Sequence, residues 1–262
     1  MRALPLPEPV PDGVQAWLLS LDPRAPIEQA DWHLLSEDEK ARAERFLQRA
    51  DRVRMAATRA ALRRQLARRL GCAPAALRFE LGPNDKPRLS PRGGHKPAVT
   101  FNVSHCGEYA LIAVSTAPGV ASLGVDIEQR RADLDLEELA EYAFTPSERA
   151  FLRRCKRSAS ESAAPPGLDY ASAFFLTWVA KEAALKALGV GISEHLQTLS
   201  VRISNERDKT SSTAPNLALE HERVQWRPLQ VCRLKAPGGY CAAIAWQVSP
   251  GQRGKSNSAS VR

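Results

Sequence analysis

The feature of the sequence that most constrains the fold is a dense β region set between two helical regions. Residues 99–103 alternate between apolar and polar side chains, residues 106–108 contain a glycine, and residues 109–115 are strongly apolar. Alternation predicts a strand with one buried face, and a short turn between two such runs predicts a hairpin. Residues 121–128 predict another strand. We therefore expect a sheet near the middle of the chain.

Helices and further strands are predicted on both sides of this region. Before it, the pattern predicts a strand at 14–21, helices at 36–49 and 51–70, a strand at 77–81 and a loop at 82–97. After it come helices at 136–142, 146–157 and 170–188, strands at the two ends of 201–222, and strands at 224–234 and 239–248. We expect a mobile loop at 158–167 and a polar insertion at 205–216.

This order of elements predicts an α+β fold (α/β in two layers) with two pseudo-symmetric halves, each packing a small sheet against helices. We place the N-terminal half at residues 1–120, the C-terminal half at residues 121–250, and a disordered polar tail at residues 251–262. A chain of 262 residues with 44% hydrophobic and 25% charged residues buries an ordinary globular core. Because one chain supplies both halves, a monomer is sufficient.

Cysteine usage and hydropathy favour a protein of the reducing cytoplasm. The five cysteines are scattered and form no C-x-x-C pair, so neither a zinc site nor a disulfide scaffold is indicated. The sequence contains no run of about 18 apolar residues, so no membrane-spanning helix is predicted. The first residues lack the apolar segment of a signal peptide. We therefore expect neither secretion nor association with a membrane.

Positive charge is concentrated in one segment. The whole chain has 37 Lys and Arg against 29 Asp and Glu, a net charge of +8, whereas residues 40–69 alone contain eleven basic and two acidic residues, a balance of +9. Such a segment either attracts a polyanion, such as nucleic acid, an anionic membrane, an acidic protein or a phosphorylated ligand, or forms a solvated helix rich in arginine. Charge alone leaves both readings open.

Two acids on the strand at 121–128 form the first candidate site. In the run GVDIE at 124–128, alternation places Asp126 and Glu128 on one face of the strand and the apolar residues on the other. Two adjacent carboxylates repel each other unless a cation lies between them, and oxygen ligands suit magnesium. The alternative is an exposed strand with two ordinary acids.

The helix at 170–188 carries the second candidate. Trp178, Glu182 and Lys186 share one face at helical spacing. Glu182 is a candidate third ligand of the magnesium site, and Lys186 is a candidate partner for phosphate. The alternative is a surface ion pair between Glu182 and Lys186 that contributes little to stability.

A third candidate lies where the strand at 99–103 runs into its turn. The run FNVSH at 101–105 offers the Ser104 hydroxyl, the His105 imidazole and backbone amides, which are groups that bind phosphate. Lys86 upstream adds a further cation. The alternatives are a turn histidine without a ligand and, for Ser104, a hydrolase nucleophile. No G-x-S-x-G motif surrounds Ser104, which disfavours the hydrolase.

Together and in this order, the motifs resemble those of the 4′-phosphopantetheinyl transferases, in their long single-chain, pseudo-dimeric class. The matching runs are DKP at 85–87, FNVSH at 101–105, LGVDIE at 123–128, FTPSE at 144–148 and FLTWVAKEAALKALG at 175–189. The resemblance spans about residues 36–199. It implies two similar halves with a coenzyme A site and the active site between them, the N-terminal half binding coenzyme A and the C-terminal half carrying the magnesium and catalytic residues.

The resemblance also implies roles for individual residues. Magnesium would be held by Asp126, Glu128 and Glu182, and the catalytic residues would be Glu182 and Lys186. The residues expected to bind coenzyme A are Arg49, Lys86, Asn102, Ser104, His105, Lys181 and Lys186.

Two positions depart from the family pattern. Asp85 stands where the family usually has glycine, before Lys86. Glu39 occupies a place where a basic residue often reaches the 3′-phosphate of the coenzyme, and Arg42 or Arg49 is the candidate substitute.

The reaction expected from the resemblance moves the phosphopantetheine arm of coenzyme A to a serine of an acyl or peptidyl carrier protein and releases adenosine 3′,5′-bisphosphate. The expected partner is acidic, which suits the basic segment. One alternative is a nucleic-acid-binding protein that uses the arginines of residues 52–69, but this leaves Asp126, Glu128 and Glu182 without a purpose. Another is a catalytically silent module that binds carrier proteins, against which the intact set of carboxylates argues.

Overall fold

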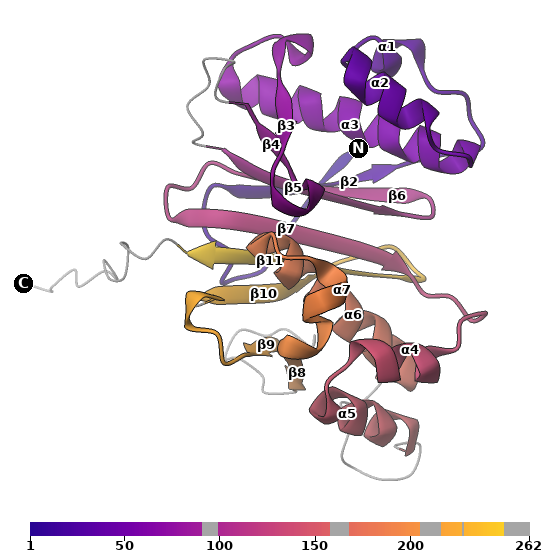
Figure 1. Cartoon of the computed structure of the whole chain (residues 1–262), viewed down its shortest axis with the longest axis vertical. Coiled ribbons are helices and arrows are strands. Elements are labelled where there is room, and N and C mark those ends of the chain that lie inside the picture. Colours follow the sequence, from indigo (N-terminus) through magenta and orange to yellow (C-terminus); the bar gives the residue numbers. More distant parts are fainter. Residues whose placement is uncertain (91–98, 158–167, 205–215, 227, 249–262) are drawn as a thin grey trace, which may run out of the picture.

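The strands of the chain form two main antiparallel sheets, as the computed structural model shows (Figure 1). The structure describes residues 1–90, 99–157, 168–204, 216–226 and 228–248. The expected loop at 158–167, nearly all of the expected insertion at 205–216, and the expected tail at 251–262 lie outside the described residues.

The first sheet has the strand order β1-β2-β6-β5. Its strands are β1 (Arg2–Leu4), β2 (Val14–Ser20), β5 (Thr100–Cys106) and β6 (Tyr109–Ser115). The expected hairpin is present between β5 and β6, and its turn contains Gly107 with a φ of 55°, a conformation that favours glycine. The short strand β1 was not expected.

The second sheet has the order β10-β11-β7, from β7 (Val120–Gln129), β10 (Leu229–Leu234) and β11 (Tyr240–Val248). Two smaller pairs join β3 (Phe79–Leu81) to β4 (Pro87–Leu89) and β8 (Ser200–Ser204) to β9 (Asn216–Glu220). The strand β4 corrects the prediction of a loop over 82–97. A strand of three residues is too short to show a period in the sequence. In the structure, Leu89 pairs with Phe79 across the hairpin and is buried.

The main helices are α2 (Glu37–Glu44), α3 (Arg49–Leu70), α4 (Leu136–Ala143), α5 (Pro146–Arg157) and α6 (Tyr170–Leu188), with one-turn helices α1 (Gln29–Trp32) and α7 (Ile192–His195). Ser36 and Glu39 form the capping box of α2. The helix predicted over 36–49 ends at Glu44, because the backbone is extended at Gln48 before α3 begins. The strand predicted from residue 224 begins only at Leu229.

The packing is helix, sheet, sheet, helix, as Figure 1 shows from α3 at the top to α6 below β7. Ile112 of β6 packs toward α3, whereas Leu111 contributes to a buried cluster shared by the two sheets. Val125 and Ile127 of β7 enter that same cluster. The predicted α+β class is therefore confirmed, while the boundary between halves near residue 121 stays a prediction.

In the part of the chain that the structure describes, no helix combines the length and the apolar character needed to cross a membrane.

Candidate active site

A compact polar cluster lies where β5, β7 and α6 meet. The Ser104 hydroxyl of β5 donates a hydrogen bond to Oδ1 of Asp126 at 2.7 Å, and the Lys186 ammonium donates to the same oxygen at 2.6 Å. Lys186 also lies 3.6 Å from Oε2 of Glu182 and donates to the Ser104 hydroxyl at 3.3 Å. The structure therefore brings together four of the residues that the sequence singled out.

The backbone of Gly124 explains why α6 comes so close to β7. A Cβ atom at this position would collide with the carbonyl oxygen of Ala183 and the amide nitrogen of Ala187, both in α6. Only glycine permits this approach, which sets Glu182 and Lys186 beside Asp126. The two faces of β7 are as predicted. Val125 and Ile127 point into the core, whereas Asp126 contacts Lys186 of α6.

Burial has the largest effect on the electrostatics of the cluster, and neighbouring carboxylates add to it. Burial, together with nearby Asp126 and Glu128, raises the pKa of Glu182 to about 7, although Lys186 opposes the shift. Burial and Asp126 also raise the pKa of Glu128. Burial disfavours the ammonium form of Lys186, but Asp126 and Glu182 outweigh it, so the pKa of Lys186 is raised. The cluster therefore favours an added positive charge.

The donors suit a divalent cation, although they are not arranged around one. Among the described residues, no group of three or more His, Cys, Asp or Glu side chains is positioned to hold a metal ion. The Lys186 ammonium instead pairs with Asp126 and Glu182. Oδ2 of Asp126 is buried and has no hydrogen-bond partner. An unsatisfied carboxylate oxygen among further carboxylates matches the oxygen ligands of magnesium in kind.

His105 lies at the edge of this cluster, on an exposed part of β5. Desolvation by the surrounding protein, with the nearby Arg54 guanidinium, lowers the pKa of His105, so the ring is neutral at pH 7. Arg54 donates to the carbonyl oxygen of Gly107 at 2.8 Å and pairs with Asp51 at 2.6 Å. No pattern in the sequence indicates these contacts of Arg54, which hold the turn that follows His105.

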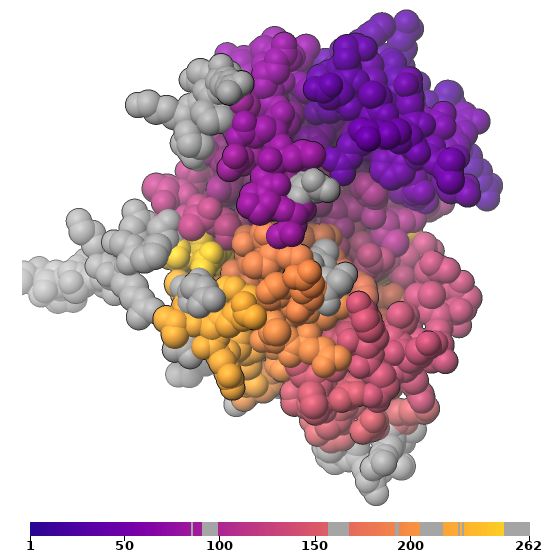
Figure 2. All heavy atoms as spheres, viewed as in Figure 1, coloured from indigo at the N-terminus to yellow at the C-terminus, as the bar shows by residue number. Residues whose placement is uncertain are grey.

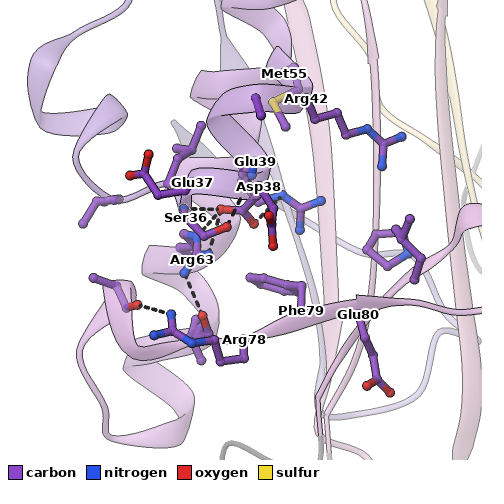
Figure 3. Close-up of a pocket in the computed structure, with 18 of the residues that line it drawn as sticks. Ser36, Glu37, Asp38, Glu39, Arg42, Met55, Arg63, Arg78, Phe79 and Glu80 are labelled. Atoms are coloured by element: carbon purple, nitrogen blue, oxygen red, sulfur yellow. Dashed lines mark hydrogen bonds and ion pairs between the residues drawn. The ribbon is translucent and has the colours of Figure 1, made fainter. Parts of the chain in front are cut away.

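A pocket of about 1120 Å³ opens between α2, α3 and the β3–β4 hairpin (Figure 3). Its lining is charged, with five arginines, Arg42, Arg45, Arg59, Arg63 and Arg78, and four acids, Glu37, Asp38, Glu39 and Glu80. Glu39 lies among the arginines, and Figure 3 shows its carboxylate joined to Arg63, with Nη2 to Oε2 at 2.7 Å. Arg59 approaches the same carboxylate at 3.3 Å. Glu39 thus neutralises part of the arginine charge in the pocket.

Several arginines of residues 40–69 have partners within the protein, so part of the segment neither attracts a polyanion nor is solvated. Arg63 is only 1% exposed and bonds to Glu39 and to backbone carbonyls. Arg64 pairs with Asp31 at 2.6 Å. Arginine spacing in the sequence could not reveal these acids, because Asp31 and Glu39 lie on other helices.

Arg42 and Arg49, the two candidates for the 3′-phosphate, lie in different places. Arg42 lines the pocket and is shown there in Figure 3. Arg49 is exposed at the first position of α3 and is not among the residues that line the pocket. Arg42 therefore lies where a ligand of the pocket could reach it, whereas Arg49 does not, and the expectation that Arg49 binds the coenzyme stays a prediction.

Three more residues expected to bind coenzyme A have other partners. Asn102 accepts a hydrogen bond from the amide of Val125, which ties β5 to β7. Lys86 donates to carbonyl oxygens at the end of α6 and in β7. Lys181 is fully buried against Glu148 on the far side of α6 from the cluster. These side chains were expected at a ligand because the motifs contain them, but motifs do not show which way a side chain points.

Comparison with known proteins shows the family of the chain. Residues 23–117 match the N-terminal 4′-phosphopantetheinyl transferase family model, and residues 122–245 match the 4′-phosphopantetheinyl transferase superfamily model. The chain belongs to the 4′-phosphopantetheinyl transferase superfamily. Because the two models match consecutive parts of one chain, it is a long single-chain member, and the resemblance seen in the sequence is confirmed.

Individual relatives cover most of the chain. A protein of Synechocystis sp., provisionally named a 4′-phosphopantetheinyl transferase, is 35% identical over 92% of this chain and 88% of its own length. The 4′-phosphopantetheinyl transferase HetI of Nostoc sp. is 34% identical over 79% of this chain and 81% of its own length. The human L-aminoadipate-semialdehyde dehydrogenase-phosphopantetheinyl transferase is 28% identical over 75% of this chain and 62% of its own length.

Proposed function

We propose that this protein transfers the 4′-phosphopantetheine arm of coenzyme A to a serine hydroxyl of an acyl or peptidyl carrier protein. The product besides the modified carrier is adenosine 3′,5′-bisphosphate. The observation that carries the proposal is the cluster of Ser104, Asp126, Glu182 and Lys186, whose clustered carboxylates and ammonium suit pyrophosphate chemistry. The arginine-lined pocket supplies cations for the nucleotide end of the coenzyme.

The residues of the cluster would have different roles in this reaction. The serine oxygen of the carrier attacks the β-phosphorus of coenzyme A, a new phosphorus–oxygen bond forms, and the bond to the bridging oxygen breaks. Glu182 takes the proton of the serine, directly or through water, and a pKa of about 7 suits a general base at neutral pH. Lys186 would stabilise the negative charge of the departing bisphosphate. The neutral ring of His105 would donate an N–H to a phosphate of the coenzyme.

Asp126, Glu128 and Glu182 are the residues that would hold magnesium. When bound, the ion would neutralise pyrophosphate charge and stabilise the leaving group. Lys186 pairs with two of these carboxylates, those of Asp126 and Glu182. We infer that the ion and the ammonium share the same negative charge, with Lys186 turning toward phosphate when the ion is present.

Magnesium binding is expected to strengthen as the pH rises through about 7. The raised pKa means that Glu182 is mainly protonated below this pH and must release its proton to bind the ion. Affinity should therefore fall about tenfold for each pH unit below 7 and level off above it. Calorimetric titration in buffers of different ionisation enthalpy measures both the affinity and the proton released. A pH-independent affinity, or the same pH dependence in Glu182→Gln, would contradict the assignment.

Substitutions of Arg42 and of Arg49 are expected to affect coenzyme binding differently. Arg42→Ala should weaken coenzyme A about tenfold more than 3′-dephospho-coenzyme A, since an exposed arginine contributes less than a buried charge-assisted hydrogen bond. Arg49→Ala should change the two affinities equally, because Arg49 does not line the pocket. Competition binding of the two ligands to each variant gives the ratio. A selective loss in Arg49→Ala alone would reverse the assignment.

The proposed activity is tested by mass spectrometry of apo carrier proteins after incubation with coenzyme A and magnesium. An added phosphopantetheine mass on the carrier, with release of adenosine 3′,5′-bisphosphate, is the expected result. An unchanged mass on fatty acid, polyketide and peptide synthetase carriers alike would contradict it. We further propose a monomer that acts in the cytoplasm on an acidic carrier. The net charge of +8 supports the choice of an acidic partner.

A further inference from the structure

The turn between β3 and β4 is hydrogen-bonded to the end of α6. The Lys86 ammonium donates to three carbonyl oxygens, those of Leu123 at 3.1 Å, Lys186 at 2.5 Å and Ala187 at 3.3 Å. Figure 1 shows this turn directly above α7 and the end of α6, and Figure 2 shows the two surfaces in contact. One cation of the N-terminal sequence therefore bonds to two elements of the C-terminal sequence.

Asn84 adds a second bond at the same place. Its side-chain amide donates to the carbonyl oxygen of Gly189 at 2.8 Å, and its own backbone has a φ of 52°, which is uncommon for a residue other than glycine. Gly189 is the left-handed C-cap of α6. The carbonyl groups at a helix C-terminus lack helical partners and carry partial negative charge, so a lysine and an amide donor stabilise this end.

The bonded carbonyls belong to the elements that build the carboxylate cluster. Lys186 offers its backbone oxygen to Lys86 while its side chain reaches Asp126. Leu123 lies on β7, on the same strand as Asp126. The Lys86 ammonium therefore holds α6 and β7 together beside the cluster, where the close approach at Gly124 leaves no room for a side chain.

We propose that Lys86 is a positioning residue that sets Lys186 against Asp126 and Ser104, rather than a ligand of the coenzyme phosphates. Burial lowers the pKa of Lys86 to about 8, so the ammonium form still predominates at pH 7. The kinetic part of this inference depends on the proposed transferase activity, whereas its structural part does not.

The test compares Lys86→Met, which keeps the aliphatic stem, with Arg88→Met, which removes an exposed cation two residues further along the chain, on β4. Arg88 pairs only across the hairpin in the contacts described, with Glu80 at 2.8 Å. Amide hydrogen exchange of the full chain without ligands reports on the end of α6. Lys86→Met should raise exchange in a peptide covering residues 183–190 by about tenfold or more, because a charge-assisted bond is lost. Arg88→Met should leave it unchanged.

Kinetics then distinguishes positioning from binding. Lys86→Met should lower kcat by about tenfold or more with little change in KM for coenzyme A, whereas loss of a phosphate ligand would raise KM. Asn84→Ala, which is an exposed and milder change, should shift exchange and kcat in the same directions. Unchanged exchange, a raised KM with unchanged kcat, or faster exchange without a loss of kcat would each overturn the proposal. If no carrier is modified at all, the exchange data still decide whether Lys86 holds α6.

Discussion

Asp126→Asn is expected to lower phosphopantetheinyl transfer by about a hundredfold to a thousandfold while the protein stays folded. The substitution keeps the shape of the side chain but removes the charge that pairs with Lys186 at 2.6 Å and leaves a poorer ligand for a cation. Loss of one electrostatic contact to the reacting groups costs about 3–4 kcal/mol in comparable sites, which corresponds to this range of rates. Initial rates at limiting magnesium, with circular dichroism of the variant, provide the measurement.

The control for this variant is Asp133→Asn. Asp133 pairs with Arg131 at 2.6 Å, and both side chains are more than half exposed. A surface pair of this kind contributes little, so transfer should stay close to that of the unsubstituted protein. If Asp126→Asn were as active as Asp133→Asn, the carboxylate cluster would not be the active site.

Lys181→Met is expected to destabilise the protein by about 3–5 kcal/mol, because it leaves the partner carboxylate buried without its cation. The side chains of Lys181 and Glu148 are 0% and 2% exposed. The ammonium donates to both oxygens of Glu148, at 2.9 and 2.6 Å, and to the carbonyl of Leu199 at 2.5 Å. Glu148 in turn accepts from the amides of Thr145 and Val201. One ion pair thus joins α5, α6 and β8.

The free energy of unfolding in urea is the quantity to measure, with Lys156→Met as the matched control. Lys156 also pairs with a glutamate, Glu137, but the two side chains are 63% and 64% exposed. Its loss should cost no more than about 1 kcal/mol. Equal destabilisation by the two variants would show that burial does not set the strength of the inner pair. A raised KM for coenzyme A in folded Lys181→Met would restore the role in ligand binding that the sequence suggested.

The contacts of Lys186 help to explain why the cluster favours binding of a further cation. Its ammonium pairs with Asp126 and Glu182, yet Oδ2 of Asp126 stays buried without a partner and the pKa of Glu182 is still raised to about 7. Burial is the main cause of this raised pKa, and the carboxylates of Asp126 and Glu128 add to it. The added positive charge that this favours is the physical basis for proposing magnesium here.

The sequence by itself determined the main helices, the hairpin of β5 and β6, the α+β class and the alternation along β7, but not the short strands β1 and β4. Local rules govern these features: side chains alternate on a strand, Ser36 caps α2, and Gly71 and Gly189 end α3 and α6 in left-handed conformations. The same rules placed Asp126 and Glu128 on one face of a strand, so the core of the candidate site was visible as a pattern.

Only the tertiary structure decided which charged side chains face that site. Lys181 and Glu182 are adjacent in the sequence, but successive residues of a helix point about 100° apart, so one is buried against Glu148 and the other approaches Lys186. Glu39, Arg63 and Lys86 likewise find partners 24 or more residues away. Contacts between residues this far apart produce no periodic pattern in the sequence. The packing of one element on another, and not local propensity, brings their charges together.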